Sequence, residues 1–340
     1  MSRERRVGTA TVLASSLALT TVSALGTPAS AATVVTVAGD GSGNFTTVQA
    51  AVNAAPSNGS GYEIDIKPGT YRGTVSVPSA KTHVTFKGLG SGSSQVVIVE
   101  NHAASQYGTQ GSATVAVSAN DFHATNLTFA NDYDEAKNGS SQAVALDLNA
   151  DRAVLDNVRV LANQDTLLLW TASTSTVGRS YIRASYIEGD VDFIFGRGTA
   201  VFDRSEIHSL SRGSSSNNGY VTAAATNNTN PYGFLFYRST LTSNAAAKSV
   251  YLGRPWHPSG DANAVGQVLF RECTLGAHIR NDPWTDMSGF SWKDARFSEY
   301  TNTGAGAAVN SNRPQLSASQ APSYTPARYL AGSDGWNPIY

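Results

Sequence analysis

Short runs of alternating hydrophobic and polar residues recur through most of the chain. Six of them share the form apolar-x-x-small/polar-apolar: DFHATNLTF, RAVLDNVRV, SYIRASYIE, AVFDRSEIH, FLFYRSTLT and VLFRECTLG, starting at residues 121, 152, 180, 200, 234 and 268. Alternation with a period of two is typical of β-strands that bury one face. The chain is therefore predicted to be all-β.

The six runs can be aligned on one small or polar position. That position holds Asn126, Asn157, Ser185, Ser205, Ser239 and Cys273. The spacings are 31, 28, 20, 34 and 34 residues, which suits solenoid coils with loops of variable length. In a parallel β-helix equivalent positions stack about 4.8 Å apart, so small polar residues can form inward ladders. An antiparallel sandwich is the alternative, but few Asn-Gly or Asp-Gly signals join the runs, which favours the β-helix.

The two ends of the predicted solenoid differ in pattern. The segment 45–55 carries apolar residues at i, i+3, i+4 and i+7, namely Val48, Ala51, Val52 and Ala55, which indicates a short helix. We expect this helix to cap the N-terminal coil, whose backbone groups would otherwise stay unpaired. The tail from Thr301, rich in Gly, Ala, Ser and Pro, is expected to be coil packed along the outside.

The N-terminus resembles a secretory signal. Basic residues at positions 3, 5 and 6 precede an apolar stretch of small residues over 7–25, and Ala29-Ser30-Ala31 forms a small-x-small cleavage site. We expect residues 1–31 to be a signal peptide and 32–340 to be a single secreted, extracellular domain. A membrane anchor is disfavoured because Thr, Ser and Gly interrupt the stretch and no later segment could span a bilayer.

The content of charged residues, cysteine and histidine limits which kinds of partner and cofactor are expected. Residues 32–340 carry 21 basic and 24 acidic side chains, so no strong field attracts nucleic acid. The single cysteine, Cys273, cannot form an intramolecular disulfide and is interpreted as a small core residue. The six histidines show no short ligand spacing, so we expect neither a metal nor a cofactor. We expect a monomer.

Four short motifs carry candidate chemistry. They are QAVAL (142–146), QDTL (164–167), DFIFG (192–196) and LGRPW (252–256). Gln142 and Gln164 are 22 residues apart, and Asp165 and Asp192 are 27 apart, so these residues can occupy neighbouring coils and face one groove. Stacking of the coils would bring the two carboxyl groups close together.

Two neighbouring carboxyl groups in a partly apolar wall cannot easily both ionise, so their pKa values should separate. One then serves as an acid and the other as a nucleophile. A guanidinium stabilises the carboxylate that it binds with its two-pronged geometry, and Arg254 is the candidate. Glutamine amides donate hydrogen bonds without adding charge, which suits an oxyanion site.

The four motifs, in this order, resemble those of the pectinesterase family, and the similarity extends from about Val34 to the C-terminus, including EYTNTGAGA at Glu299. The resemblance implies a right-handed parallel β-helix and the hydrolysis of methyl esters on pectin, with a role in pectin breakdown and cell wall modification. It implies that Asp192 attacks the ester carbonyl. Asp165 would protonate the departing methanol and then activate water.

The remaining roles also follow from the resemblance. Gln142 and Gln164 would hold the oxyanion, and Arg254 would orient Asp192. Trp256, and less directly Thr114 and Phe195, would contact the sugar chain. Two positions depart from the family pattern: Gly73 stands where glutamate is usual, and Leu168 follows QDTL where an aromatic residue is common. The second departure predicts one sugar contact fewer.

Two other enzyme classes and a carbohydrate-binding protein are the alternatives that the sequence leaves. A pectate lyase would need a carboxylate-rich calcium site, and a glycoside hydrolase would cut the backbone with two carboxylates. A non-catalytic carbohydrate-binding solenoid would not need converging aspartates. No G-x-S-x-G elbow is present, which disfavours a serine esterase. Four further aspartates are interpreted as turn or cap residues: Asp132, Asp134, Asp147 and Asp151.

Overall fold

The computed structural model describes residues 1, 2, 4, 8 and 32–340. The expected signal peptide therefore lies outside the described residues, apart from four positions. From Ala32 to Tyr340 the chain forms one compact unit. Among the described residues, no helix is long and apolar enough to cross a membrane.

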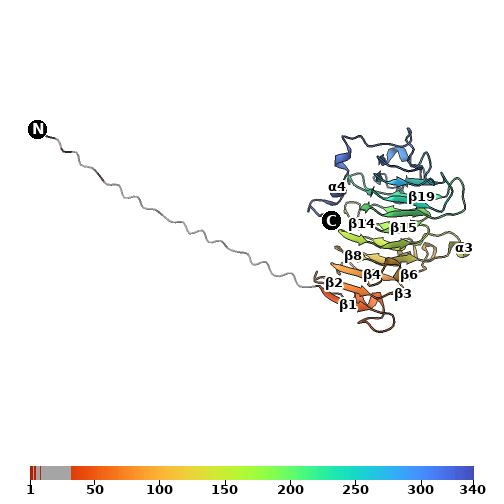
Figure 1. The fold of residues 1–340 in the computed structure, drawn as a ribbon, viewed down its shortest axis with the longest axis horizontal. Coiled ribbons are helices and arrows are strands. Elements are labelled where there is room, and N and C mark those ends of the chain that lie inside the picture. The colour runs from red at the N-terminus through yellow and green to blue at the C-terminus, as the bar shows by residue number, and fades with distance from the viewer. Residues whose placement is uncertain (3, 5–7, 9–31) are drawn as a thin grey trace. The chain divides into compact units, whose positions relative to one another are not determined.

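This unit is built from three parallel sheets that the chain visits in rotation (Figure 1). Sheet A contains β1 (Thr33–Val37), β2 (Tyr62–Ile66), β5 (Val84–Gly88), β8 (His123–Thr125), β11 (Ala153–Asp156), β14 (Arg179–Arg183), β17 (Thr199–Asp203), β20 (Phe234–Tyr237), β23 (Gln267–Arg271) and β25 (Arg296–Tyr300). Sheet B contains β3 (Gly69–Arg72), β6 (Val96–Glu100), β9 (Thr128–Asn131), β12 (Arg159–Leu161), β15 (Tyr186–Gly189), β18 (Glu206–Ser209), β21 (Thr240–Ser243) and β24 (Thr274–Leu275). Sheet C contains β4 (Val75–Val77), β7 (Val115–Val117), β10 (Leu146–Leu148), β13 (Leu167–Leu169), β16 (Val191–Gly196), β19 (Gly219–Ala224) and β22 (Val250–Pro255).

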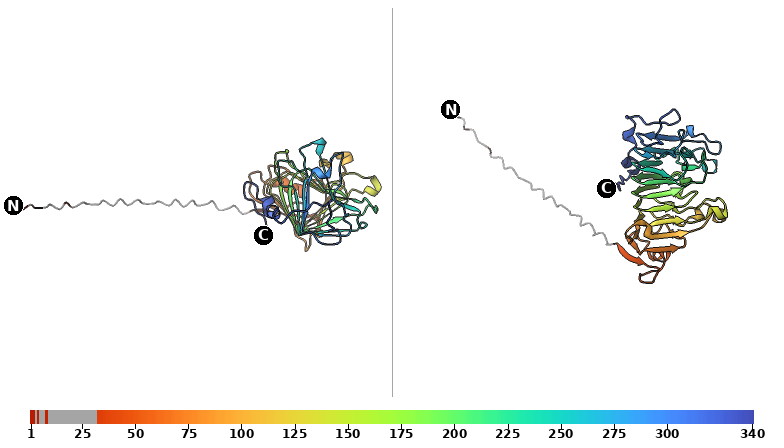
Figure 2. Two further views of the ribbon diagram at one scale, coloured as in Figure 1. Left: turned by 90° about the horizontal axis from the view of Figure 1, so that it is seen from above. Right: turned by 45° about the vertical axis from the view of Figure 1, so that its right-hand side comes forward.

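From β2 to β24 successive strands belong to sheets A, B and C in turn, so each coil lies on the one before it (Figure 2). The predicted parallel β-helix is thus confirmed, and the antiparallel sandwich is excluded. Alternation along the strands points one side chain in two toward the interior. Equivalent interior positions stack in register: the rings of Phe202, Phe236 and Phe270, from β17, β20 and β23, lie parallel with centroids 4.5 and 4.3 Å apart.

The corner between sheets A and B corrects the sequence alignment. Asn126 and Asn157 occupy one column, with φ values of 56° and 52°, and the Asn157 amide donates to Asn126 Oδ1 at 3.1 Å. Ser185, Ser205 and Ser239 occupy the next column, which is buried. There each backbone N–H of Ser185 and Ser205 donates to the hydroxyl of the following serine, at 3.2 and 3.1 Å. Aligning all six runs on one position was therefore wrong by one residue for the first two coils.

The remaining elements are short helices in the connections and at the ends. They are α1 (Val48–Ala54), α2 (Ala104–Tyr107), α3 (Glu135–Asn138) and α4 (Pro326–Leu330), with 3-10 turns η1 (Ser93–Gln95), η2 (Gln110–Ser112), η3 (Pro258–Gly260), η4 (Trp292–Asp294) and η5 (Ala321–Ser323). The predicted helix at 45–55 is confirmed as α1, although it begins later, because Thr47 Oγ1 accepts the Ala50 N–H and caps it. Its buried face packs on β1, β2 and β4 at the N-terminal end of the solenoid.

The C-terminal tail lies along the outer face of sheet A, as expected, but it is not coil throughout. Tyr329 and Leu330 of α4 are buried and join an apolar cluster on this face with Tyr181 and Val201. Arg179 anchors the same segment, since its Nη1 donates to Leu330 O at 2.9 Å. The apolar outer positions of sheet A therefore form a second core under the tail.

Candidate active site

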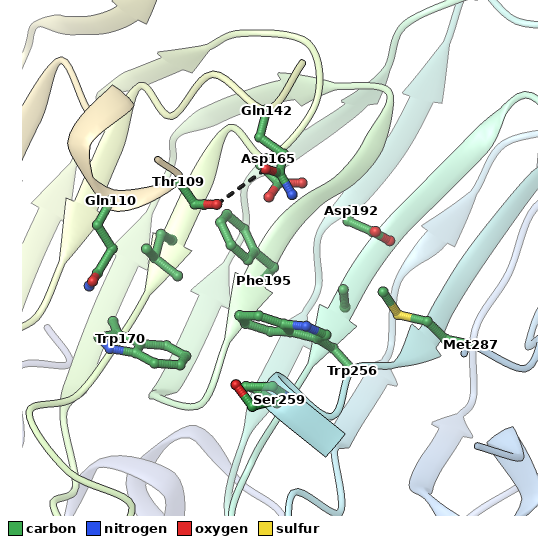
Figure 3. A pocket seen from close by; sticks show the side chains of 13 residues that line it. Thr109, Gln110, Gln142, Asp165, Trp170, Asp192, Phe195, Trp256, Ser259 and Met287 are labelled. Carbon is green, nitrogen blue, oxygen red and sulfur yellow. Dashed lines mark hydrogen bonds between the residues drawn. The ribbon is translucent and has the colours of Figure 1, made fainter. Parts of the chain in front are cut away.

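A groove with a volume of about 310 Å³ lies on the outer face of sheet C. It crosses the coils of β7 to β22, so its lining comes from segments far apart in sequence. Figure 3 shows Gln142, Asp165 and Asp192 in this groove with Phe195 and Trp256 beside them. Five of the eight residues predicted for the site thus line this groove, and a sixth, Arg254, contacts it through Asp192.

Asp192 reaches the groove because β16 is irregular. The register between β16 and β19 shifts between Val191 and Ile194, which is a β-bulge, and Asp192 has a φ of 50°. Phe193 and Ile194 consequently both belong to the interior core, and Asp192 and Phe195 both line the groove. Bulges commonly re-aim a side chain at an active site in this way.

The Arg254 guanidinium binds the Asp192 carboxylate in a bidentate manner. Nε donates to Oδ1 at 2.8 Å and Nη2 donates to Oδ2 at 2.6 Å, while the same guanidinium lies over the Tyr220 ring at 3.8 Å. Burial raises the pKa of Asp192, and the Arg254 guanidinium opposes that rise. Two charge-assisted hydrogen bonds favour the carboxylate form of Asp192.

Asp165 sits one coil away, joined by its backbone N–H to Val191 O at 3.0 Å. The residue is 4 % exposed, and its φ of 64° lies in the left-handed region that aspartate tolerates. Burial, followed by the negative charge of Asp192, raises the pKa of Asp165 well above its usual range. The two carboxyl groups therefore differ in their surroundings: Asp192 is bound by a guanidinium, whereas burial and a neighbouring negative charge raise the pKa of Asp165.

The two glutamines are placed differently. Thr109, which lies in none of the four motifs, donates its hydroxyl to Gln142 Oε1 at 3.2 Å (Figure 3). This bond orients the amide so that Nε2 is the group left to donate into the groove. Gln164 lies outside the groove lining, although its amide lowers the pKa of the neighbouring Asp165.

Aromatic rings form the side of the groove below the carboxyl groups. Phe195 and Trp256 lie with ring centroids 5.7 Å apart, and Trp170 lies at the same distance from Trp256. Trp170 follows Leu168 by two residues, so the alternation of β13 places both on the outer face. Trp170 thus supplies an aromatic surface in the region where Leu168 predicted one sugar contact fewer. Period-two alternation starting from Leu168 would have indicated that Trp170 lies on the same face.

Thr114 is not brought to the groove. It is fully buried, and its hydroxyl donates to Ala130 O at 2.8 Å, so it serves the connection between coils. The lining also includes Gln110 of η2, Ser259 of η3 and Met287 of a loop, and none of these connections carries a motif or a periodic pattern. Asp134 does cap a helix, α3, as interpreted, but Asp147 lies in the middle of β10, so its interpretation as a turn residue was wrong.

Steric crowding explains why two of the motif positions, Gly196 and Gly253, are glycine. A Cβ on Gly196, whose φ is 121°, would lie 2.0 Å from Leu169 O, and a Cβ on Gly253 would lie 2.1 Å from Thr222 Oγ1. In each case the two strands cannot move apart to make room without breaking the parallel pairing of β16 or β22, the strands that carry Asp192 and Arg254.

Within 32–340 no cluster of three or more His, Cys, Asp or Glu side chains has a metal-binding arrangement.

Comparisons with known proteins agree with this geometry. The family model for Pectinesterase matches residues 34–333. A pectinesterase of Ralstonia solanacearum is 40% identical over 312 residues, covering 79% of this chain and 79% of the relative. The solved pectin methylesterase PemA from Erwinia chrysanthemi aligns with a TM-score of 0.80 and 34% identity over 90% of this chain and 98% of that one. A pectin methylesterase in complex with a hexasaccharide aligns with a TM-score of 0.81 and 34% identity, over 91% and 98%.

Proposed function

Because the chain belongs to the pectinesterase family and is a carboxylic ester hydrolase, we propose that it removes methyl esters from pectin through a covalent intermediate on Asp192. The observation that carries the mechanism is the unequal environment of the two aspartates. Arg254 binds the Asp192 carboxylate through two hydrogen bonds, whereas burial and a neighbouring negative charge raise the pKa of Asp165.

In the first half-reaction an Asp192 oxygen attacks the carbonyl carbon of the methyl ester. The carbonyl oxygen becomes an oxyanion, to which Gln142 Nε2 donates, with Gln164 as the second predicted donor. Collapse of the tetrahedral intermediate breaks the bond to the methoxy oxygen, which takes the proton of Asp165 and leaves as methanol. The product is a mixed anhydride between Asp192 and the uronic acid.

In the second half-reaction Asp165, now ionised, removes a proton from water as the water attacks the acyl carbon. The anhydride bond breaks, the uronate leaves with a free carboxylate, and Asp192 returns to its ionised state beside Arg254. Asp165 then carries a proton taken from water, in place of the one that left with methanol. Atoms and charge balance with one water consumed and one methanol and one proton released.

The substrate proposal rests on the groove and on the relatives. The groove crosses several coils and is lined by three aromatic rings, which suits an extended polysaccharide whose sugar faces stack on rings. A structurally similar pectin methylesterase is solved with a hexasaccharide. A pectate lyase or a glycoside hydrolase would instead release unsaturated or reducing ends, which gives a clear distinction between products.

The test measures methanol and chain length together. Wild-type protein should release methanol from highly methylated pectin in the presence of EGTA without lowering its viscosity. Asp192→Asn should lower methanol release by at least 10³-fold, since an amide cannot form the acyl intermediate, and Asp165→Asn by about 10²–10⁴-fold through loss of the general acid. Asp156→Asn, on β11 of sheet A, is the matched control. Undiminished methanol release by Asp192→Asn would exclude the assigned nucleophile.

We also propose that the protein is exported and acts as a monomer outside the cell. N-terminal sequencing of the protein from culture medium should begin after Ala31, the end of the small-x-small site. Retention of residues 1–31 in exported protein would contradict the cleavage site. Light scattering on the mature protein should give the mass of one chain, and a dimer mass would contradict the monomer.

A further inference from the structure

A hairpin over residues 284–292 carries Met287, one of the side chains that line the substrate groove. The hairpin begins at Trp284, which is buried in the interior core and pairs with β22. At its tip Met287 and Phe290 exchange backbone hydrogen bonds of 3.1 and 2.9 Å. The two residues between them have φ values of 52° and 86°, which is the backbone of a tight type I′ turn.

Hydrogen bonds do not fasten the tip of this hairpin to the coils of the solenoid. Within the part of the chain that the structure describes, residues 286–291 bond only to one another and to the adjoining turn η4. Besides the pair at the tip, Asp286 Oδ1 accepts the Trp292 N–H at 2.9 Å. Another kind of contact must therefore hold Met287 in its place.

That contact is a stack of two aromatic rings. His257 and Phe290 lie parallel within 7°, with ring centroids 3.6 Å apart. His257 stands between Trp256 and Pro258, which both line the groove, but it does not line the groove itself. Its Nδ1 lies 2.8 Å from Asp261 O, and because a carbonyl oxygen only accepts, Nδ1 is the donor. The imidazole is thus fixed within its own loop and presents a face to Phe290.

The stack joins two segments that line the groove from different parts of the chain. The loop 257–261 contributes Ser259 and the hairpin contributes Met287. Figure 3 shows both near Trp256, with Met287 on the side of Asp192. If the hairpin leaves this place, the substrate has to bring it back on binding. Apparent affinity then falls with the fraction of molecules whose hairpin is already docked, whereas the saturated complex keeps the hairpin in place.

We propose that His257 is a positioning residue of the groove, which stacks on Phe290 and so holds Met287 in place before the substrate arrives. The inference rests on the proposed action on methylated pectin. It assigns the effect to the flat ring of His257, because the hydrogen bond from Nδ1 stays within the loop 257–261 and does not reach the hairpin. Loss of the ring should therefore change KM and leave kcat nearly as it is.

The experiment measures kcat and KM separately for methanol release from a fully methylated hexagalacturonate. His257→Ala and Phe290→Ala should each raise KM about three- to tenfold, which is the worth of one aromatic pair, with kcat within about twofold of wild type. The double variant should raise KM no further than either single variant, since each substitution removes the same contact.

Two other substitutions of His257 separate the ring from the hydrogen bond. His257→Phe keeps a flat ring without the donor, so its KM should stay within about twofold of wild type. His257→Asn keeps an N–H donor near the position of Nδ1 but has no ring, so it should behave like His257→Ala. His208→Ala is the matched control: it breaks the stack with Tyr186 on sheet B, where the centroids are 5.9 Å apart, and should leave both constants unchanged.

A purely structural role would lower the unfolding temperature of His257→Ala without changing KM, and that result overturns the inference. An equal rise of KM in His257→Phe and His257→Ala, or a fall in kcat at unchanged KM, also overturns it. If His257→Ala does not fold, Phe290→Ala and His257→Asn carry the same test. Absence of methanol release by the wild-type protein would instead overturn the proposed function.

Discussion

Replacing Arg254 by methionine tests the electrostatic basis of the proposed catalysis. The substitution keeps much of the side-chain volume but removes the hydrogen bonds of 2.8 and 2.6 Å to the Asp192 carboxylate. Asp192 is 5 % exposed, so water cannot replace the guanidinium. Leaving a buried charge without its partner costs about 3–5 kcal/mol.

Asp192 can avoid most of that cost by taking up a proton, because burial already raises its pKa and Arg254 is the group that opposes the rise. A neutral carboxylic acid does not attack the ester. Since about 1.4 kcal/mol corresponds to a factor of ten, we expect the ionised fraction near neutral pH, and with it kcat/KM, to fall about 10²–10⁴-fold. An acid with a raised pKa ionises as pH increases, so activity should recover toward alkaline pH.

The assay is the initial rate of methanol release from methylated oligogalacturonate between pH 5 and 9. Arg254→Lys is the matched variant: it keeps the charge but loses the two-pronged geometry, so its loss should be smaller than that of Arg254→Met. Asp192→Asn in the Arg254→Met background should recover stability in denaturant unfolding, because no charge remains buried. A loss under tenfold, or an equal loss at every pH, would refute the assignment of Arg254 as the group that keeps Asp192 ionised.

Three further outcomes are expected. Trp170→Ala and Trp256→Ala should each raise KM for oligosaccharides about five- to thirtyfold, as loss of roughly 1–2 kcal/mol of ring contact implies, and an unchanged KM in steady-state assays would contradict a sugar-binding role. Asp147→Asn should stabilise the protein by up to about 4 kcal/mol above pH 7. The reason is that the pKa of Asp147 is about 7 in the folded protein and lower in the unfolded chain, so the stability of the wild-type protein falls as pH rises from about 4 to 7. Denaturant unfolding at pH 4 and 8 checks this, and an equal gain at both would contradict it. Arg313→Met should cost about 3–5 kcal/mol in urea unfolding because it leaves the buried Glu299 carboxylate without its charged partner, and the loss should shrink when Glu299→Gln accompanies it.

The sequence determined the parts of this protein that depend on regular repetition. Period-two alternation reports which face of a strand a residue takes, and runs recurring at intervals of one coil indicate stacking, so the parallel β-helix and the interior positions could be predicted. The helix α1 followed from its own 3.6-residue pattern. The motifs selected Gln142, Asp165, Asp192 and Arg254 because carboxyl, amide and guanidinium groups at coil spacing suit one groove.

Only the tertiary structure decided the features that interrupt this regularity. The bulge in β16 turns Asp192 outward while Phe193 and Ile194 both turn inward, and nothing in the alternation of an apolar run such as VDFIFG marks such a shift. The corner of each coil holds one left-handed residue: Asn126 and Asn157 occupy that position themselves, whereas Ala184, Arg204 and Arg238 occupy it just before the serines. The small polar residues of the two groups therefore lie one position apart. Thr114 was expected to contact sugar and Asp147 to be a turn residue, yet Thr114 supports a coil connection and Asp147 lies buried at the centre of β10. Contacts of this kind join residues with no common period, so long-range packing of the coils places them.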